Sequence, residues 1–397
     1  MIISKRINSI KESVTLATEA KAKQLEREGR DIIGFGAGEP DFDTPTHIKE
    51  AAKRAIEEGF TKYTPASGII ELKSAICKKL REENNLFYRE NQVIVSCGAK
   101  HAIFNAIVTL CQEGDEVILP SPFWVSYPEM IRASGAKIVV IETEQKNDFK
   151  VTSQQLEKAI TPRSKLFILN SPSNPTGTMY LREELEELAK VILKHRIFCL
   201  SDEIYEKILY DNIEFVSIAS LKEEIKDLTI LVNGVSKAYA MTGWRIGYAC
   251  AEEKIIQAMS SLQSHSTSNP TSISQKAALA ALTGPQDCVD KMVEEFAKRR
   301  DYIVNKLNSI KGISCFKPKG AFYVFPCIKE LLGKSYKGKV IENSLQFSEM
   351  LLEESNVAVV AGIAFGKDDY IRLSYATSLK NIEKGIDRIK DFVEKLN

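Results

Sequence analysis

The chain contains few of the residues that hold metal ions or form disulfide frameworks. Its 397 residues include eight cysteines and four histidines. The cysteines are scattered singly without a C-x-x-C pair, and the histidines lie far apart, so we expect neither a metal site nor a disulfide framework. Several cysteines lie in apolar, strand-like segments, which is typical of small buried thiols in a reducing compartment.

An excess of charge of one sign is also absent. Lys and Arg total 54 against 53 Asp and Glu, a net charge of +1, which leaves no electrostatic footprint for nucleic acid or an anionic membrane. Residues 1–8 lack the apolar segment of a signal peptide. Residues 255–275 carry no charged side chain, but they are rich in Ser, Thr, Asn and Gln and include Pro270, which excludes a membrane span. We therefore expect a soluble, cytoplasmic protein.

Glycine-rich loops that bind nucleotides are missing as well. Residues 34–38 (GFGAG) begin like a dinucleotide-binding fingerprint, but Glu39 stands where the third glycine belongs and Pro40 follows at once. No helix can open there, so an NAD-dependent oxidoreductase is not expected. The chain also lacks the Gly-x-x-x-x-Gly-Lys-Ser/Thr phosphate loop of nucleotide triphosphatases.

A regular alternation of short apolar segments and helical patterns is present between about residues 50 and 290. Apolar strands separated by helices indicate an α/β fold, with a mostly parallel sheet covered by helices on both faces. We predict strands at 92–96, 115–119, 137–142, 165–170, 197–202, 228–233 and 245–251, and helices at 46–58, 69–83, 99–112, 123–134, 182–195 and 272–283.

A smaller α+β unit follows this region, and a chain of this length is expected to form two domains. We place the large domain at residues 46–290 and the small domain at 291–397. Apolar positions at helical spacing over residues 10–29 predict a further helix that stops at Gly29. After a long helix over 287–310, we predict strands at 322–326, 357–360 and 369–375 and helices at 344–354 and 379–396.

Residues 234–248 (GVSKAYAMTGWRIGY) are the most informative segment, and they lie between two predicted strands. Lys237 would lose hydration there without an obvious carboxylate partner. Such a lysine gives up its proton readily, which suits it to Schiff-base chemistry with an aldehyde. Arg245 offers a fork of donors suited to a phosphate. An aldehyde and a phosphate together indicate pyridoxal phosphate (PLP), whereas an exposed lysine and a salt-bridged arginine are the alternative for this segment alone.

Two other strand ends offer candidate cofactor contacts. Gly98, Ala99 and Lys100 follow a predicted strand and open a helix, where free backbone N–H groups and the helix dipole favour a phosphate. An ordinary strand–helix turn is the alternative, and the lysine and arginine downstream favour the phosphate. Asp202 ends another strand, where α/β sheets place ligand-binding groups. Its carboxylate could keep the pyridine nitrogen of PLP protonated, and its neighbour Glu203 competes for this role.

Taken together, these segments resemble those of the fold-type-I PLP-dependent aminotransferases. Within that family the chain is similar to the bacterial aspartate and aspartate/prephenate aminotransferases of class I, almost from end to end. The motifs that carry the resemblance are residues 36–42 (GAGEPDF), 121–128 (SPFWVSYP), 173–177 (SNPTG), 201–206 (SDEIYE), 234–248 and 372–377 (RLSYAT).

The resemblance implies a role for each cofactor contact. Lys237 becomes the Schiff-base residue and general base, and Asp202 rather than Glu203 becomes the partner of the pyridine nitrogen. For two of the other contacts a structural explanation also exists, because Asn174 before a proline favours a turn and Trp124 is also explained as a core residue. The remaining implied contacts are Tyr205 and Asn174 to the phenolic oxygen, Trp124 to the ring face, and Ser236 to the phosphate.

The resemblance also implies substrate contacts and a homodimer. Arg372 is flanked by apolar residues, and a buried arginine requires an anionic partner. The family match makes it the clamp on the substrate's α-carboxylate, with the backbone of Gly38 on the other side. Tyr63 resembles the tyrosine that reaches the phosphate of the neighbouring subunit's cofactor, so active sites would be shared. The N-terminal segment, residues 1–45, would pack with the small domain.

Substrate preference depends on two lysines. Lys100 resembles a lysine that turns toward the distal carboxylate of a dicarboxylic substrate, and Lys11 resembles an N-terminal lysine associated with prephenate. Solvated surface lysines are the alternative for both. No segment clearly supplies the partner-subunit arginine that the better-known branch of the family uses.

The expected reaction is a ping-pong transfer of the amino group between L-aspartate or L-glutamate and 2-oxoglutarate or oxaloacetate. Amination of prephenate to arogenate is a further expectation. Alternatives are an aromatic or alanine aminotransferase, or a PLP lyase on the same scaffold. A non-catalytic protein that keeps the fold is a third alternative, and the joint presence of the predicted lysine, carboxylate and arginines argues against it.

Overall fold

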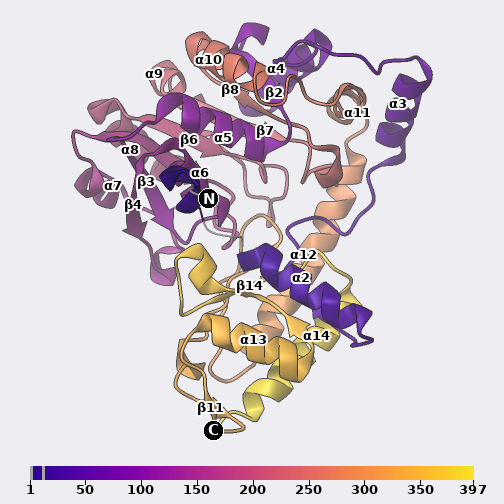
Figure 1. The fold of residues 1–397 in the computed structure, drawn as a ribbon, viewed down its shortest axis with the longest axis vertical. Coiled ribbons are helices and arrows are strands. Elements are labelled where there is room, and N and C mark those ends of the chain that lie inside the picture. Colours follow the sequence, from indigo (N-terminus) through magenta and orange to yellow (C-terminus); the bar gives the residue numbers. More distant parts are fainter. Residues whose placement is uncertain (1–2, 11–13) are drawn as a thin grey trace.

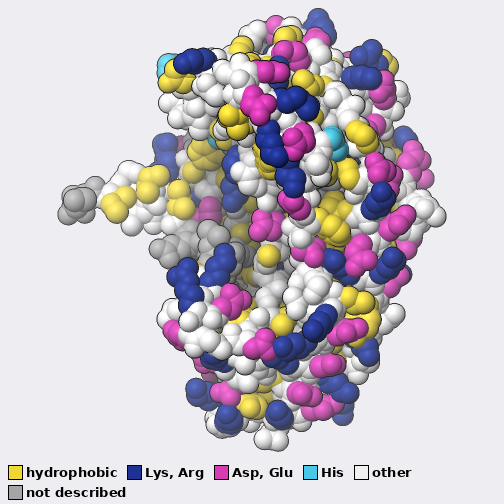
Figure 2. Space-filling view, turned by 90° about the vertical axis from the view of Figure 1, so that its right-hand side faces the viewer, with side chains coloured by type: hydrophobic (Ala, Val, Ile, Leu, Met, Phe, Trp, Pro, Cys, Tyr) yellow, Lys and Arg dark blue, Asp and Glu magenta, His cyan; other side chains and the backbone are white. Residues whose placement is uncertain are grey.

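The computed structural model describes residues 3–10 and 14–397 and consists of a larger and a smaller part (Figure 1). The long helix α12 (Asp287–Asn308) runs from one part to the other. Within the described residues, no helix is long and apolar enough to cross a membrane, and no group of three or more His, Cys, Asp or Glu could hold a metal ion. Basic and acidic side chains are interspersed over the face shown in Figure 2.

The larger part is built around a seven-stranded sheet in the order β2-β8-β7-β6-β5-β3-β4. All neighbouring strands are parallel except that β8 runs antiparallel to both β2 and β7. The prediction of a mostly parallel sheet is confirmed, and each predicted strand is present with its ends shifted by at most two residues. The bounds are β2 Val93–Ser96, β3 Glu116–Ser121, β4 Lys137–Glu142, β5 Ser164–Asn170, β6 Phe198–Asp202, β7 Thr229–Gly234 and β8 Gly247–Cys250.

Helices cover both faces of the sheet, because successive residues of a strand point to opposite sides. Ile94 of β2 packs in a core formed with α5, α6 and α10, whereas Val95 packs in a core formed with α3, α4 and α11. The helices of this part are α3 Thr46–Glu57, α4 Ile70–Asn84, α5 Ala99–Leu110, α6 Ser126–Ser134, α7 Ser153–Ala159, α8 Arg182–His195, α9 Glu223–Asp227, α10 Glu253–Ser264 and α11 Ser272–Thr283.

The predicted helix over 123–134 is three residues too long at its start. Helix α6 begins at Ser126, because the preceding loop is held by the smaller part. The backbone N–H of Phe123 donates to the carbonyl oxygen of Phe365 at 3.1 Å, which draws this residue away from the helix axis. The loop therefore presents Trp124 toward the region between the two parts of the molecule.

The smaller part contains a three-stranded antiparallel sheet in the order β13-β14-β9 (Val360–Ala361, Ile371–Ser374, Tyr323–Val324). Helices α13 (Ser344–Ser355) and α14 (Leu379–Glu394) flank it. The N-terminal segment lies against this part: helix α2 (Val14–Arg27) is followed by β1 (Ile33–Gly34), which pairs in parallel with β12 (Val357–Ala358). Phe35 is fully buried in the same core. The short helix α1 (Lys5–Asn8) lies beside α6 of the larger part.

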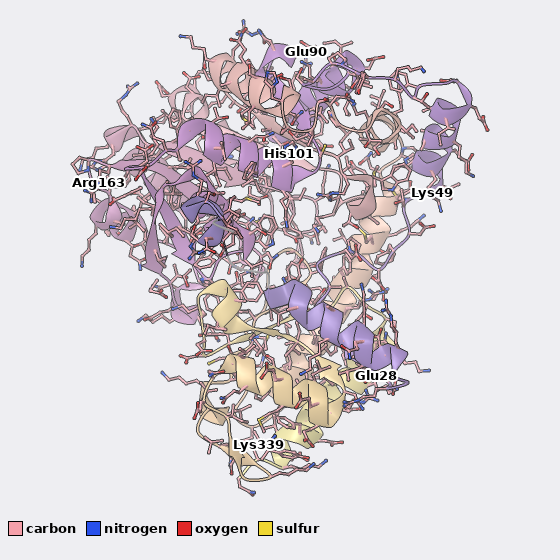
Figure 3. All side chains as sticks on the ribbon, in the orientation of Figure 1. Glu28, Lys49, Glu90, His101, Arg163 and Lys339 are labelled. Carbon is pink, nitrogen blue, oxygen red and sulfur yellow. The ribbon has the colours of Figure 1, made fainter. Side chains whose placement is uncertain are left out.

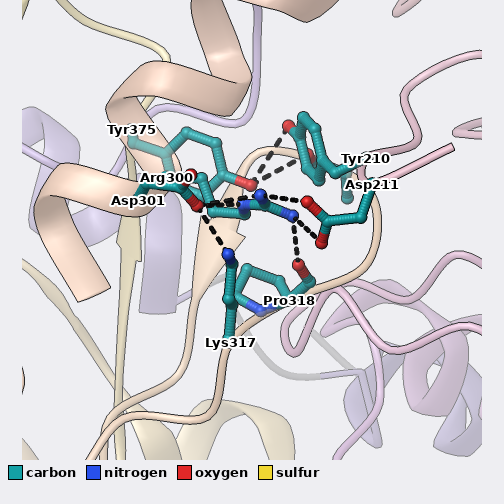
Figure 4. A network of polar contacts seen from close by, with 8 residues as sticks. Tyr210, Asp211, Arg300, Asp301, Lys317, Pro318 and Tyr375 are labelled. Atoms are coloured by element: carbon teal, nitrogen blue, oxygen red, sulfur yellow. Dashed lines mark hydrogen bonds and ion pairs between the residues drawn. The ribbon is translucent and has the colours of Figure 1, made fainter. Parts of the chain in front are cut away.

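A buried arginine joins the two parts of the molecule (Figure 4). Arg300 of α12 forms two hydrogen bonds of 2.8 Å to the carboxylate of Asp211, in the loop region after β6. It also bonds to its neighbour Asp301 at 2.9 Å and to the carbonyl oxygen of Pro318 at 3.2 Å. Lys317 reaches the same Asp301 at 3.0 Å. This bidentate contact ties the long helix to the larger part.

Candidate active site

A cavity of about 540 Å³ opens at the carboxyl ends of β5, β6 and β7. Residues of the N-terminal segment and of the smaller part close it from the other side. Parallel strands place ligand-binding groups at this end of a sheet. The predicted site residues that line the cavity are Gly38, Ala99, Lys100, Trp124, Asn174, Asp202, Tyr205, Ser236, Lys237, Arg245 and Arg372.

Three predicted site residues stand apart from this group. Gly98 lies directly beside the cavity, at the N-terminus of α5, but does not line it. The side chain of Tyr63 is 90% exposed and lies outside the cavity. Lys11 lies outside the described residues.

Lys237 stands on the loop after β7, within the cavity. Its Nζ atom donates a hydrogen bond of 2.5 Å to the carbonyl oxygen of Gly38. Loss of hydration lowers the pKa of Lys237 to about 8, and the nearby Arg245 and Arg372 act in the same direction, while Glu39 and Asp202 oppose it. A substantial share of this amine is therefore unprotonated and nucleophilic at mildly alkaline pH.

Asp202 ends strand β6 and is 4% exposed. The hydroxyl of Tyr127 donates to its Oδ2 at 2.6 Å, and the backbone N–H of Ile204 donates to Oδ1 at 3.3 Å. Burial raises the pKa of Asp202 to about 6, although both hydrogen bonds and the charge of Lys237 work against the rise. Its carboxylate can therefore accept a hydrogen bond from a protonated nitrogen of a ligand in the cavity.

The N-terminus of α5 and Arg245 form a cationic pocket at one end of the cavity. Gly98 has φ +88°, and a Cβ atom there would lie only 2.4 Å from Nη2 of Arg245, so only glycine fits without a shift. Arg245 donates to the carbonyl oxygens of Thr242 at 2.9 Å and Cys97 at 3.3 Å. No carboxylate in the described chain pairs with it at ion-pair distance. The first turn of α5, which contains Lys100 and His101, can be found in Figure 3 by the label of His101. Such a pocket suits a phosphate.

Arg372 forms a second anion site on strand β14. It is 3% exposed and donates to Oδ1 of Asn174 at 3.1 Å and to the carbonyl oxygen of Gly36 at 2.6 Å. The rings of Tyr323 and Phe365 lie beneath its guanidinium, at 4.7 and 5.1 Å from their centroids. Its Nε atom has no hydrogen-bond partner in the described structure. A buried guanidinium with a free donor and no carboxylate partner is suited to bind a carboxylate ligand.

Trp124 and Lys100 contact each other in the wall of the cavity. The Nζ atom of Lys100 lies 4.9 Å from the centroid of the indole, a cation–π contact. Burial lowers the pKa of Lys100, and the positive charge of Arg245 adds to this effect. The rings of Trp124 and Tyr127 pack nearly at right angles, with centroids 5.2 Å apart and an interplanar angle of 87°. The amine of Lys100 therefore stands at the indole without an ionic partner in the described chain.

Several lining residues are not among the predicted ones. Tyr127 bonds to Asp202, and Tyr323 bonds through its hydroxyl to that of Tyr205 at 2.7 Å. Glu39 accepts a hydrogen bond of 2.7 Å from Thr242. Tyr127 and Glu39 lie inside the motifs at 121–128 and 36–42, which was the available signal. Tyr323 lies in an apolar strand that carries no such signal. Polar residues that line the cavity but were not predicted include Glu39, Tyr127, Asn170 and Tyr323.

A sequence comparison assigns the chain to a family. The family model described as aminotransferase class I and II matches residues 30–389. The aspartate aminotransferase of Bacillus subtilis (strain 168) is 50% identical over 395 residues, which cover 100% of both chains. The aspartate/prephenate aminotransferase of Cereibacter sphaeroides (strain ATCC 17029 / ATH 2.4.9) is 49% identical over 397 residues, 100% of this chain and 99% of that protein.

Solved structures agree with this assignment. The crystal structure of the aspartate aminotransferase from Rhizobium meliloti superposes with a TM-score of 0.97 at 45% identity, covering 100% of both chains. The aspartate aminotransferase from Thermus thermophilus with maleate gives a TM-score of 0.93 at 42% identity, covering 98% of this chain and 99% of that one. The predicted resemblance and the predicted fold class are both confirmed.

Proposed function

This chain belongs to the class I and II aminotransferases, and on that premise we propose that it is a PLP-dependent aminotransferase of aspartate and glutamate, with oxaloacetate and 2-oxoglutarate as acceptors. The observation that carries the proposal is one cavity that joins a lysine of lowered pKa, Lys237, to a buried carboxylate, Asp202. Two arginines without carboxylate partners in the described chain, Arg245 and Arg372, stand in the same cavity. Few reactions require this combination.

The residues present fit PLP, as judged by the donors that lack partners within the chain. When bound, PLP supplies an aldehyde and a ring that accepts electrons. Lys237 would hold the aldehyde carbon and Asp202 the pyridine nitrogen. The glycine cradle at the start of α5, where a side chain would collide with Arg245, suits a phosphate. The further cofactor contacts that we propose are Gly98, Ala99, Lys100, Ser236 and Arg245 to the phosphate, Tyr205 and Asn174 to the phenolic oxygen, and Trp124 to the ring face.

The substrate's α-carboxylate would bind to Arg372. Asn174 and the carbonyl of Gly36 hold the guanidinium in place through hydrogen bonds of 3.1 and 2.6 Å. Such a fork grips a carboxylate with two parallel bonds and fixes the orientation of the α-carbon. Gly38 would approach the same carboxylate with its backbone, since it has no side chain and lines the cavity.

Lys237 is the group that moves the substrate's α-proton in this proposal. Its amine is freed of hydration and has a pKa of about 8, so its neutral form is accessible near physiological pH. A base with a pKa close to the working pH combines the right protonation state with a useful driving force. The hydrogen bond to Gly38 directs this amine toward the segment where the substrate would lie, which supports the role.

The distal carboxylate of aspartate would pair with Lys100. This lysine lines the cavity beside Trp124 and has no carboxylate partner in the described chain. The Thermus thermophilus relative was solved with maleate, itself a dicarboxylate, which supports a dicarboxylic substrate. Relatives named aspartate/prephenate aminotransferase support prephenate as a second acceptor. The role of Lys11 toward prephenate remains a prediction.

We also propose a homodimer with shared active sites, in which Tyr63 reaches the partner's cofactor phosphate. Although its side chain is 90% exposed, its loop is firmly anchored. Gln275 accepts a hydrogen bond from the N–H of Ile69 at 2.8 Å and donates to Thr64 at 2.9 Å. A rigid loop that presents an exposed aromatic ring is expected of a contact surface. The pairing of β1 with β12 supports assigning residues 1–45 to the smaller domain, 291–397.

A donor panel tests the proposed function. The purified protein, reconstituted with PLP, is assayed with aspartate, glutamate, alanine and phenylalanine against 2-oxoglutarate and oxaloacetate, and with prephenate as an added acceptor. Aspartate and glutamate should give the highest kcat/KM, with 2-oxo acid as product. A higher kcat/KM for alanine or phenylalanine would contradict the dicarboxylate assignment, and release of pyruvate with ammonia would indicate a lyase.

A further inference from the structure

Tyr127 connects two parts of the site that the sequence motifs treat separately. It belongs to the first turn of α6 and is 1% exposed. Its hydroxyl donates to Oδ2 of Asp202 at 2.6 Å, a length typical of a bond to a carboxylate. Its ring meets the indole of Trp124 edge-on, with centroids 5.2 Å apart. One side chain therefore contacts both the carboxylate and the indole that line the cavity.

The carboxylate of Asp202 has few other partners. The titratable groups that interact with it are Tyr127 from α6, Lys237 from the loop after β7, and Tyr205 from its own loop. The backbone N–H of Ile204 bonds to the other oxygen at the longer distance of 3.3 Å. The bond from the tyrosine is thus the short side-chain bond that fixes the rotation of the carboxylate. A buried carboxylate that loses such a donor is less stable as an anion.

The edge-on contact with Trp124 gives Tyr127 a second positioning role, toward the indole. Edge-to-face packing holds the plane of the indole at a defined angle. The amine of Lys100 also contacts this indole, at 4.9 Å from the ring centroid. A displaced tyrosine ring would therefore release the indole as well as the carboxylate.

We propose that Tyr127 is a positioning residue, which would hold the Asp202 carboxylate in place for the pyridine nitrogen of PLP and would orient the indole of Trp124 for the pyridine ring. This inference deepens the proposed function and depends on it where the cofactor is concerned. The hydroxyl acts through Asp202 and the ring acts through Trp124. Tyr127 itself transfers no proton.

The first test uses the protein without cofactor. Aspartate labelled with ¹³C at Cγ allows the carboxyl groups to be titrated by NMR, and the Asp202 signal is the one missing from Asp202→Asn. We expect Tyr127→Phe to move the Asp202 midpoint to higher pH than in the parent, because the anion loses a donor. Tyr210→Phe is the matched control, since Tyr210 is also a buried tyrosine whose hydroxyl bonds to a carbonyl, that of Ala321, outside the cavity.

The second test uses the reconstituted enzyme. Tyr127→Phe should bind PLP more weakly than Tyr210→Phe by about tenfold to a hundredfold, the range expected for one hydrogen bond to a charged group, with a matching loss of turnover. An unchanged Asp202 midpoint, or a shifted midpoint with unchanged PLP affinity and turnover, would overturn the inference. If the parent itself neither bound PLP nor transaminated, the proposed function would fail, and the NMR midpoint would still decide whether Tyr127 controls Asp202.

Discussion

The Nζ atom of Lys237 lies 2.5 Å from the carbonyl oxygen of Gly38, so a lysine of the larger part is hydrogen-bonded to the N-terminal segment. The same segment supplies Glu39, which bonds to Thr242 at 2.7 Å in the loop beyond the lysine. Together with the bond from Arg372 to the carbonyl oxygen of Gly36, these contacts hold residues 36–39 over the cavity. The amine must leave the Gly38 carbonyl when it reacts. The reaction of Lys237 therefore breaks one of the contacts that hold this segment.

The reactivity of Lys237 should follow its lowered pKa. The amine reacts only when unprotonated, and its pKa is about 8, so its modification in the cofactor-free protein should rise as the pH increases through about 8 and level off above it. Labelling with an amine-reactive reagent, followed by peptide mapping at several pH values, measures this curve. A midpoint above pH 10 would show that the cavity does not desolvate the amine.

Asp202 and Glu203 are adjacent buried carboxyl groups, of which only Asp202 lines the cavity. Asp202→Asn should lower turnover on the order of a hundredfold, comparable to the loss of one preorganised electrostatic contact. Glu203→Gln should retain activity, because Glu203 does not line the cavity. Burial raises the pKa of Glu203 to about 8, and Ser201 and Ser217 donate to it at 2.8 and 2.6 Å, so a neutral amide resembles it. Single-turnover rates of both variants check this, and equal losses would contradict the assignment.

Lys100→Ala should affect dicarboxylic substrates selectively. Only aspartate and glutamate lose a charge partner, so their KM should rise on the order of tenfold, about 1.4 kcal/mol, while the KM for alanine changes little. Lys339→Ala, at an exposed lysine far from the cavity (Figure 3), serves as the control. A parallel rise of KM for alanine and aspartate would mean that the side chain of Lys100, and not only its backbone N–H, contributes to cofactor binding rather than to substrate preference.

Tyr63 should act across a subunit interface. Mixing Tyr63→Phe with Lys237→Ala protein should form heterodimers in which one site receives both changes and the other receives neither. That intact site should give about half of the parental activity per dimer, more than either variant alone. Activity no higher than the average of the two variants, or a monomer in sedimentation at working concentration, would refute the shared site.

Much of the fold could be predicted because its strands are apolar and regularly spaced. Strands β2, β5 and β7, for example, contribute buried side chains to both faces, and their apolar sequences mark them plainly. The start of α6 could not be predicted, because the bond from Phe123 to Phe365 joins residues more than 200 positions apart. Helix α10 was not predicted, because most of it lies in the uncharged, serine-rich stretch at 255–275. The buried Gln263 anchors it through hydrogen bonds of 2.6 and 2.7 Å to the distant backbone carbonyls of Ala66 and Val95.

The site shows the same division between local and distant information. Lys237, Asp202 and Arg372 lie in motifs or in strands that mark them as unusual, so residue type and position suffice to select them. Tyr323 has no such mark, because its importance arises from the hydroxyl of Tyr205, 2.7 Å away in the fold and 118 positions away in the chain. Only tertiary structure brings these two groups together.

The most direct test of the central claim is reduction of the PLP-loaded protein with borohydride, followed by mapping of the labelled peptide. Lys237 stands in the cavity with the desolvated amine that Schiff-base chemistry requires. We predict one labelled lysine per chain, at position 237, and no label in a Lys237→Ala protein that still folds. A label at Lys100, the other lysine that lines the cavity, or no covalent label at all, would contradict the account.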